Sequence, residues 1–254
     1  MNSWSALIKK EFKLTKDIFF VGIALIFLVW GGTFLIEQAA DASQGVMLAG
    51  MTAGVFMHFL YVPVYLFISM QKEMSTLPLW LHNPQPMYRL VSAKVASGVL
   101  CMIVSLLVNG VIVLFLIGTT APLVEWPSVW ETTLFSGIGG TMLITYSLYL
   151  SLYILLFFAI YLVIRNIFNK WTWLVMVVLF LGVNWIIGKV SDSSIYAFLT
   201  QWGEFTITFQ TGVLSQMGDM FPAHFYAGTA VFHVVVMVLV FTISTLLIDR
   251  KAEV

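Results

Sequence analysis

The sequence is poor in charge and in cysteine. Only 9% of its 254 residues are charged and 60% are apolar, whereas a soluble domain is about 25% charged and about 45–50% apolar. Twelve basic and twelve acidic residues cannot cover a water-facing surface of this size, so we expect an integral membrane protein. The formal net charge of zero lacks the basic excess of a nucleic-acid-binding protein. The single cysteine, Cys101, excludes a disulfide framework and a multi-cysteine metal site.

Six long apolar runs stand out, at residues 18–36, 45–70, 95–118, 136–164, 171–188 and 229–248. Each is close to the roughly 20 residues that a transmembrane helix needs. None shows the alternation of a barrel strand, and all twelve basic and twelve acidic residues lie outside them. The sequence therefore predicts an all-α integral membrane protein with six transmembrane helices, in a single transmembrane domain over residues 1–254.

The basic residues predict the orientation of the chain. Eleven of the twelve lie in the N-terminal segment, in the loops after the second and fourth runs, and at the C-terminus. With six spans these segments are all on one side, and only Lys189 falls on the other. By the positive-inside rule, both termini are predicted to be cytoplasmic.

Residues 1–17 precede the first run and contain an amphipathic pattern over 3–16. Apolar residues there recur at helical spacing, and three lysines face away from them. This pattern predicts an N-terminal helix that lies in the membrane interface; the alternative is a basic flank that only orients the first span. The apolar residues are Trp4, Leu7, Ile8 and Phe12, and the lysines are Lys9, Lys13 and Lys16.

Two further segments outside the runs are unusually apolar. Residues 71–94, on the cytoplasmic side, contain the short apolar stretch 77–81, followed by Pro84 and Pro86, which break a helix. That stretch either docks on a protein partner or packs under the bundle or against lipid headgroups. Residues 189–228, on the external side, contain eight aromatic residues. We expect them to form short helices that re-enter the outer leaflet or cap the bundle.

The apolar runs offer little catalytic chemistry. They hold no carboxylate, lysine or arginine, the groups from which ion relays in membranes are built, so any uphill transport is expected to be powered by another subunit. No P-loop is present, because the nearest match, around Gly182, has the wrong spacing. Cys101, His58 and His233 show no catalytic or metal-ligand spacing. Each histidine is either a hydrogen-bonded core residue or a functional group.

Polar residues recur at about four-residue spacing in three of the runs. Such stripes either join helices or line a cavity. The stripe Ser97, Cys101, Ser105 and Asn109 is expected to join helices, whereas the tyrosine-bearing stripes are better cavity candidates because a buried hydroxyl needs a polar partner. The predicted pathway-lining residues are His58, Tyr61, Tyr65, Thr145, Tyr149 and Tyr153.

Three features are shared with a known family. They are the basic amphipathic segment, the loop residues Glu73, Ser75-Thr76-Leu77, Leu79-Trp80-Leu81, Pro84, Arg89 and Lys94, and the C-terminal sequence Leu-Ile-Asp-Arg-Lys-Ala-Glu-Val. Together they resemble the permease subunits of type-2 ABC exporters, the membrane subunits of bacterial peptide, antibiotic and polymer exporters. Ser75 and Ala252 stand where that family usually has glycine and valine.

The resemblance implies a transport subunit of the bacterial plasma membrane that is not itself an enzyme. ATP and Mg would be bound by a separate ABC ATPase, into which loop 71–94 would insert as a coupling helix, and this chain would need no cofactor. A second permease subunit, identical or a sister chain, would complete the path. The implied ATPase-coupling residues are Glu73, Leu77, Trp80, Leu81 and Arg89.

Uncharged spans suit an amphipathic or apolar cargo, since they offer aromatic, methionine and hydroxyl surfaces and no fixed cation. Among the family's cargoes, antimicrobial or cytolytic peptides, including phenol-soluble modulins, fit best. Two other classes stay open. One is an intramembrane enzyme, such as a hydrolase or lipid-modifying transferase, and the other is a passive channel, sensor or assembly factor.

Overall fold

The computed structural model describes residues 3–40, 43–74, 85–120, 129–206 and 224–252. Its helices include six segments long and apolar enough to cross a membrane, each overlapping one of the six apolar runs. The prediction of a multi-pass, all-α membrane protein is therefore confirmed. The segments are Trp4–Ala39, Thr52–Met74, Met87–Phe115, Ser136–Arg165, Asn169–Ser191 and Ala227–Arg250.

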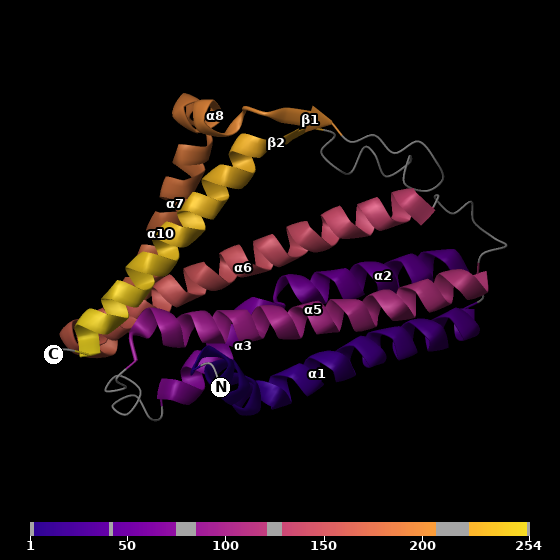
Figure 1. The fold of residues 1–254 in the computed structure, drawn as a ribbon, viewed down its shortest axis with the longest axis horizontal. Helices are drawn as coiled ribbons and strands as arrows, with labels where there is room; N and C mark the ends of the chain where they lie inside the picture. The colour runs from indigo at the N-terminus through magenta and orange to yellow at the C-terminus, as the bar shows by residue number, and fades with distance from the viewer. Residues whose placement is uncertain (1–2, 41–42, 75–84, 121–128, 207–223, 253–254) are drawn as a thin grey trace. The chain divides into compact units, whose positions relative to one another are not determined.

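The chain groups into two compact units, Met1–Val124 with Ser136–Ile154, and Glu125–Phe135 with Leu155–Val254. Each is described here by itself. The elements, labelled in Figure 1, are α1 (Ser3–Ala40), α2 (Ser43–Phe59), α3 (Tyr61–Met74), α5 (Met87–Thr120), α6 (Val129–Phe168), η2 (Asn169–Trp171), α7 (Thr172–Ser191), α8 (Ser194–Thr200), β1 (Glu204–Thr206), β2 (His224–Tyr226) and α10 (Ala227–Ala252).

In the first unit, α1 packs against α5, α2 and α3, and α5 packs against α3. The second predicted span is broken at Leu60, between α2 and α3. Pro63, in the first turn of α3, explains the break, because it has no N–H to donate to the carbonyl oxygen of Phe59 and its ring clashes with that carbonyl. The N–H of Val62 donates instead to Oγ of Ser147 on α6, at 3.3 Å. A side chain of a neighbouring helix thus replaces a lost helical hydrogen bond.

The predicted N-terminal helix and the first span form one unbroken helix, α1, which runs from Ser3 to Ala40. That its first part lies in the membrane interface stays a prediction. The side chains that it buries are Leu7, Glu11 and Thr15, four residues apart. Trp4 and Phe12 are about two-fifths exposed. The face of α1 that packs against the other helices therefore carries the carboxylate of Glu11. The apolar face expected from the sequence is only partly buried.

In the second unit, the described residues between α7 and α10 form one short helix, α8, and two short strands. Short helices that re-enter the leaflet or cap the bundle were predicted over 189–228, and residues 207–223 of that segment lie outside the described residues. Ser193 caps α8 by accepting the N–H of Tyr196 at 3.2 Å, and α8 packs on α10. Strands β1 and β2 pair antiparallel, with Phe205 opposite Phe225 and their rings stacked at 5.6 Å. Cross-strand aromatic pairs of this kind stabilise extended backbone, which explains why part of the aromatic segment is not helical.

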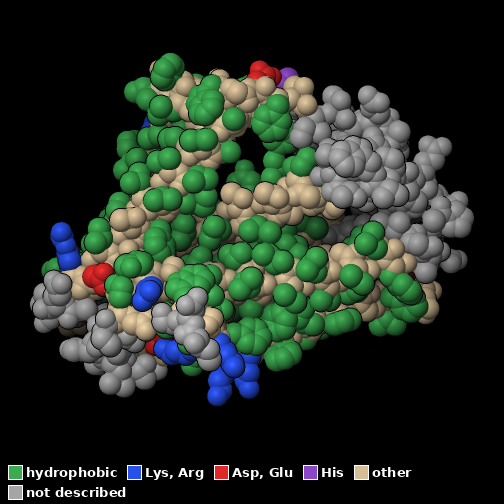
Figure 2. Space-filling model, viewed as in Figure 1, with side chains coloured by type: hydrophobic (Ala, Val, Ile, Leu, Met, Phe, Trp, Pro, Cys, Tyr) green, Lys and Arg blue, Asp and Glu red, His purple; other side chains and the backbone are tan. Residues whose placement is uncertain are grey.

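Hydrophobic side chains cover most of the surface seen in Figure 2, and lysine and arginine side chains gather near the N-terminal end of α1. Large exposed residues such as Phe56, Leu107 and Phe115 lie along the spans of the first unit. Contiguous apolar surface of this extent is rare on a soluble monomer. It is the surface expected of helices that face lipid.

Candidate functional site

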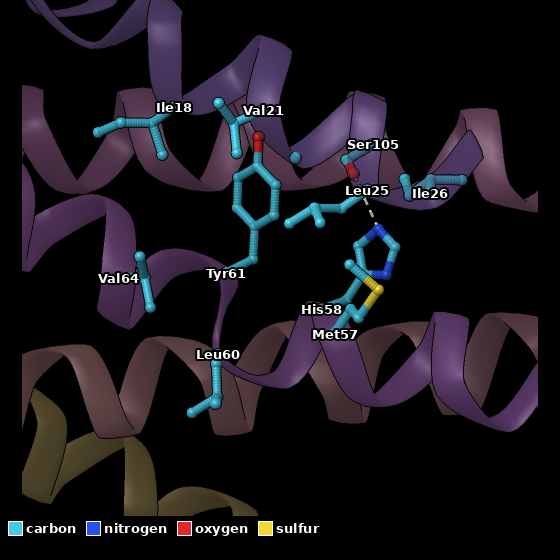
Figure 3. Close-up of a pocket in the computed structure, with 11 residues that line it drawn as sticks. Ile18, Val21, Leu25, Ile26, Met57, His58, Leu60, Tyr61, Val64 and Ser105 are labelled. Atoms are coloured by element: carbon cyan, nitrogen blue, oxygen red, sulfur yellow. Dashed lines mark hydrogen bonds between the residues drawn. The ribbon is translucent and has the colours of Figure 1, made fainter. Parts of the chain in front are cut away.

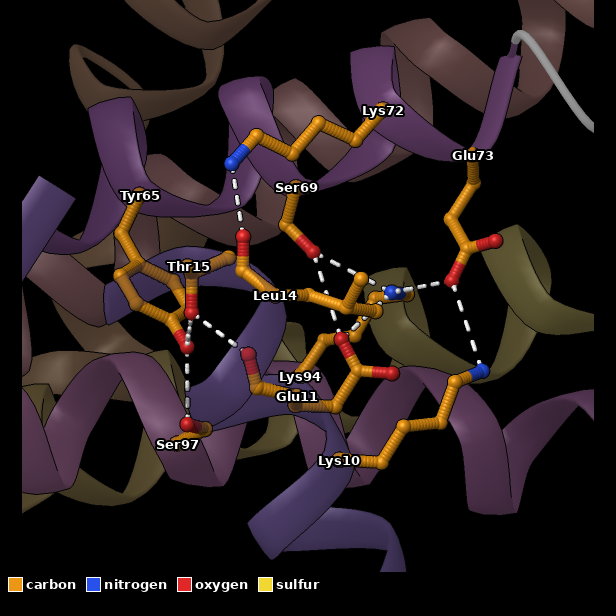
Figure 4. A network of polar contacts seen from close by, with 10 residues as sticks. All are labelled: Lys10, Glu11, Leu14, Thr15, Tyr65, Ser69, Lys72, Glu73, Lys94 and Ser97. Atoms are coloured by element: carbon orange, nitrogen blue, oxygen red, sulfur yellow. Dashed lines mark hydrogen bonds and ion pairs between the residues drawn. The ribbon is translucent and has the colours of Figure 1, made fainter. Parts of the chain in front are cut away.

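A buried cluster of charges joins three helices of the first unit (Figure 4). Nζ of Lys94, on α5, donates to Oε2 of Glu11 on α1 at 2.6 Å and to Oε1 of Glu73 on α3 at 2.9 Å. Its third hydrogen bond goes to Oγ of Ser69 at 3.2 Å. Lys94 is 0% exposed and Glu11 is 2% exposed. An ammonium group has three N–H donors, and here each has an acceptor.

A second cation balances the cluster. One lysine faces two carboxylates, which leaves one negative charge in excess. Nζ of Lys10, on α1, lies 3.9 Å from Oε1 of Glu73 and is about half exposed. Buried charges persist only when they are paired and hydrogen-bonded. Both conditions are met here, so the cluster can hold α1, α3 and α5 together at the ends of the helices.

A second layer of hydrogen bonds lies next to the charges along the same helices. Oη of Tyr65, which is fully buried, is 2.8 Å from Oγ of Ser97 on α5 and also contacts Oγ1 of Thr15 on α1. Its ring packs on Gly98, where an added Cβ would lie only 2.8 Å from Cδ1 of the tyrosine. The small residue therefore allows α3 to approach α5 closely, which is how membrane helices commonly pack.

Further along α5, two more residues of its polar stripe contact neighbouring helices. Oγ of Ser105 is 2.9 Å from Nε2 of His58, whose Nδ1 lies 2.6 Å from the carbonyl oxygen of Gly54. Trp30, on α1, donates its indole N–H to Oδ1 of Asn109 at 2.9 Å. Ser97, Ser105 and Asn109 thus join α5 to its neighbours. His58 is a hydrogen-bonded core residue, one of the two interpretations that its sequence position allowed.

A cavity of about 150 Å³ lies beside His58, at the break between α2 and α3 (Figure 3). Side chains of α1, α2, α3 and α5 line it, and they are apolar except for His58, Tyr61 and Ser105. Oη of Tyr61 is buried and has no hydrogen-bond partner among the described residues. Lining residues such as Val21 and Leu60 are about half exposed, so the cavity opens on the surface of the bundle.

The predicted pathway residues fall into two groups. His58, Tyr61 and Tyr65 belong to the core just described, and of these His58 and Tyr61 line the cavity. On α6, Oη of Tyr149 lies 3.0 Å from Oη of Tyr153, while Oγ1 of Thr145 donates to the carbonyl oxygen of Thr141 at 2.8 Å. Their role in lining a pathway stays a prediction.

The predicted ATPase-coupling residues are only partly described. Leu77, Trp80 and Leu81 lie outside the described residues. Glu73 is in the last turn of α3 and belongs to the buried cluster. Arg89 is in the first turn of α5, where its backbone N–H donates to the carbonyl oxygen of Pro86 at 2.9 Å. No three His, Cys, Asp or Glu side chains gather as a metal site in the described part of the chain.

Glu11 and Lys94 were missed as partners of Glu73, although the sequence carried a signal for them. Glu73 continues the stripe of Tyr65 and Ser69 by one more step of four residues. Lys94 precedes Ser97 by three residues and so continues the stripe of α5, while Glu11 and Thr15 are four residues apart on α1. A charged residue in register with a polar stripe faces the same neighbouring helix as that stripe.

Comparison with known proteins gives little further information. No family model matches the chain, and no solved structure matches it. The uncharacterized protein YhcE of Bacillus subtilis (strain 168) is 32% identical over 101 residues, which is 39% of this chain and 39% of that protein. The match thus spans well under half of the relative, and it assigns no activity. Fold and composition define the chain as a multi-pass, all-α membrane protein.

Proposed function

We propose that this chain is the permease subunit of an ATP-driven ABC exporter in a bacterial plasma membrane, with both termini cytoplasmic. ATP and Mg would be bound by a separate ATPase subunit, and a second permease, identical or a sister chain, would complete the path. The loop and C-terminal motifs supply the resemblance. The structural observation that carries the proposal is the buried cluster of Glu11, Glu73 and Lys94, two of which lie on the helices before and after residues 75–84.

The cluster joins the helices that precede and follow residues 75–84. Glu73 lies one residue before the end of α3, and Lys94 lies two turns into α5, so their 2.9 Å hydrogen bond joins the helices on either side of the loop. The 2.6 Å bond from Lys94 to Glu11 adds α1. A displacement of the loop would therefore move three helix ends together. A subunit driven by a separate ATPase needs such a connection, whereas a passive channel does not.

The proposed cargo is amphipathic or apolar, with an antimicrobial or cytolytic peptide as the best candidate. The support is chemical. In the described spans, the charged residues lie toward the helix ends, and the middle of the first unit offers aromatic, methionine and hydroxyl groups such as Tyr61, Met57 and the Tyr149–Tyr153 pair. Aromatic faces and the flexible thioether of methionine bind apolar surfaces of varied shape.

The decisive test replaces Trp80, within the apolar stretch 77–81, with aspartate. We expect Trp80→Asp to abolish co-purification with the partner ATPase, or peptide-stimulated ATP hydrolysis in proteoliposomes, while the chain still inserts. Trp171→Asp is a matched control, because Trp171 is more than half exposed and on the same predicted side of the membrane. Full export by Trp80→Asp, or the absence of any ATPase bound to the wild-type chain in native membranes, would refute the proposal.

The orientation has its own test in a Cys101→Ala background. Asp192 and Lys170 are both exposed and lie at opposite ends of α7, which begins at Thr172 and ends at Ser191. We expect a cysteine replacing Asp192 to react with a membrane-impermeant maleimide in intact cells, and one replacing Lys170 to react only after lysis. The opposite pattern would place the termini outside.

A further inference from the structure

The burial of Glu11 leaves a row of lysines without a counter-charge. Glu11 is the one acidic residue among residues 3–16, which contain four lysines. It points into the bundle and pairs with Lys94 at 2.6 Å. The next acidic residue, Asp17, lies 3.8 Å from Nζ of Lys72 on α3. Both carboxylates that could have neutralised the start of α1 are thus engaged by cations from other helices.

The remaining lysines share one face of α1. At about 100° per residue, Lys9, Lys13 and Lys16 fall within an arc of about 60°, roughly opposite Glu11. All three are exposed. The ion pairs found among the described residues include Lys10 but none of these three. We name Lys9, Lys13 and Lys16 the lysine face.

The lysine face continues into an apolar stripe. Phe20 and Phe27 lie on the same side of α1, four and eleven residues beyond Lys16, and about three-fifths of each is exposed. Phe12, about two-fifths exposed, flanks the lysines. One face of the helix therefore presents cations first and aromatic rings next. This order matches a bilayer leaflet, in which phosphates lie outside and acyl chains inside.

The position of the lysines along α1 also agrees with the depth of the lipid headgroups. Residues 18–39 rise about 33 Å at 1.5 Å per residue, which covers the hydrocarbon core of about 30 Å. The headgroup layer on each side is about 5–8 Å thick. For a helix along the membrane normal, Lys16 and Lys13 lie about 3 and about 8 Å outward from residue 18, within that layer, and Lys9 lies about 14 Å outward, beyond it. Cations at this height meet lipid phosphates within one Debye length, about 8–10 Å.

We propose that the lysine face is a binding surface for anionic phospholipid headgroups of the cytoplasmic leaflet. Three exposed cations without counter-charges attract an anion, and the adjoining phenylalanines contact the acyl chains of the same lipids. A phosphatidylcholine headgroup carries its own cation and gains little from this surface. An acidic protein would satisfy the lysines but not the row of rings below them. The surface does not depend on the transport function proposed above.

The test uses the full chain in dodecyl maltoside, with short-chain dioctanoyl phosphatidylglycerol as the probe and the phosphatidylcholine analogue for comparison. Tryptophan fluorescence reports the midpoint of thermal unfolding as lipid is added. For the wild type we expect the midpoint to rise with phosphatidylglycerol only, and 0.5 M NaCl to suppress the rise, because salt screens exposed charges. An equal rise with both lipids would overturn the proposal.

Variants test whether the lysine face is the source of the stabilisation by phosphatidylglycerol. Near an anionic surface each lysine contributes about fivefold in affinity, so the triple variant Lys9→Gln, Lys13→Gln, Lys16→Gln should need roughly a hundredfold more phosphatidylglycerol for the same rise. If the triple variant does not fold, each single variant should need about fivefold more. The triple Lys→Arg variant should retain the response. Lys170→Gln, Lys189→Gln, Arg250→Gln is a matched control, since it removes three exposed cations elsewhere.

Two further results would refute the lipid assignment. The first is a triple glutamine variant whose unfolding midpoint rises with phosphatidylglycerol as much as that of the wild type, or a matched control that loses as much of this rise as the triple glutamine variant. The second is a triple glutamine variant that keeps its response to phosphatidylglycerol but no longer co-purifies with an ATPase, which would make the lysine face a protein-binding surface. Because the lipid assay contains no ATPase, its outcome is independent of the exporter proposal.

Discussion

Replacement of Lys94 with methionine is the most direct test of the buried cluster. Methionine keeps an unbranched side chain of similar length but removes Nζ, and with it the hydrogen bonds to Glu11, Glu73 and Ser69. Glu73 would keep Lys10 at 3.9 Å, whereas Glu11, only 2% exposed, would lose its ion-pair partner. Breaking a buried ion pair from one side costs about 3–5 kcal/mol. We expect Lys94→Met to lower the free energy of unfolding by about that amount.

A compensating change separates charge from packing. In the double variant Glu11→Gln, Lys94→Met, no uncompensated charge remains at Glu11, and a buried pair replaced by uncharged groups is often close to neutral. We therefore expect the double variant to be more stable than Lys94→Met alone, with a coupling energy of about 2–3 kcal/mol. Lys170→Met, at an exposed position, should change stability by no more than about 0.5 kcal/mol.

The measurement is reversible unfolding of the purified chain in mixed micelles, titrated with dodecyl sulfate and followed by tryptophan fluorescence. A loss below about 1 kcal/mol for Lys94→Met would show that the three helices are not held by this cluster. A double variant as unstable as the single one would show that the lysine acts through its hydrogen bonds to Ser69 and Glu73, and the uncompensated charge of Glu11 would then not be the cause.

Two further predictions concern the layers beyond the charges. Gly98→Ala places a Cβ 2.8 Å from the ring of Tyr65 and should lower the free energy of unfolding by about 1–3 kcal/mol. Gly110→Ala adds a Cβ with nothing within 4 Å, so it should leave stability unchanged or raise it by up to about 1 kcal/mol. Equal effects of the two variants in the same titration would contradict the close contact at Gly98. Asn109→Leu removes the hydrogen bond from Trp30 and should cost about 0.6–1.7 kcal/mol, and an unchanged midpoint would show that this bond adds nothing.

The six spans could be predicted because a helix that faces lipid needs apolar side chains along most of its length, so each span is visible in the sequence as a long apolar run. The break at Leu60 has a local cause as well, since Pro63 withholds a backbone N–H. The group that accepts the N–H of Val62 at the break is not local. Ser147 lies 85 residues away from Val62, and only the packing of α6 beside the break brings its hydroxyl there.

The apolar runs alone do not predict the charged cluster, because Glu11, Glu73 and Lys94 all lie outside them. The polar stripes indicate which face of each helix carries the charge, but they do not identify the partner. The choice depends on which helices are neighbours, and the pairing of α1, α3 and α5 is a tertiary property. Strands β1 and β2 were not predicted for the same reason, because Phe205 pairs with Phe225, which lies 20 residues further along the chain.

The order of polar groups along α5 bears on how the first unit could transmit movement. Helices in lipid gain no hydrophobic energy from leaving it for one another, so interhelical hydrogen bonds and close packing decide their arrangement. The charged cluster and the Tyr65 layer join α1, α3 and α5 at one end, whereas beyond them the cavity and the Leu60 break interrupt the packing. Under the proposed function, a force transmitted through residues 75–84 would move the joined ends as one body. The change of shape would then fall at Leu60, where a single side-chain hydrogen bond replaces the helical one.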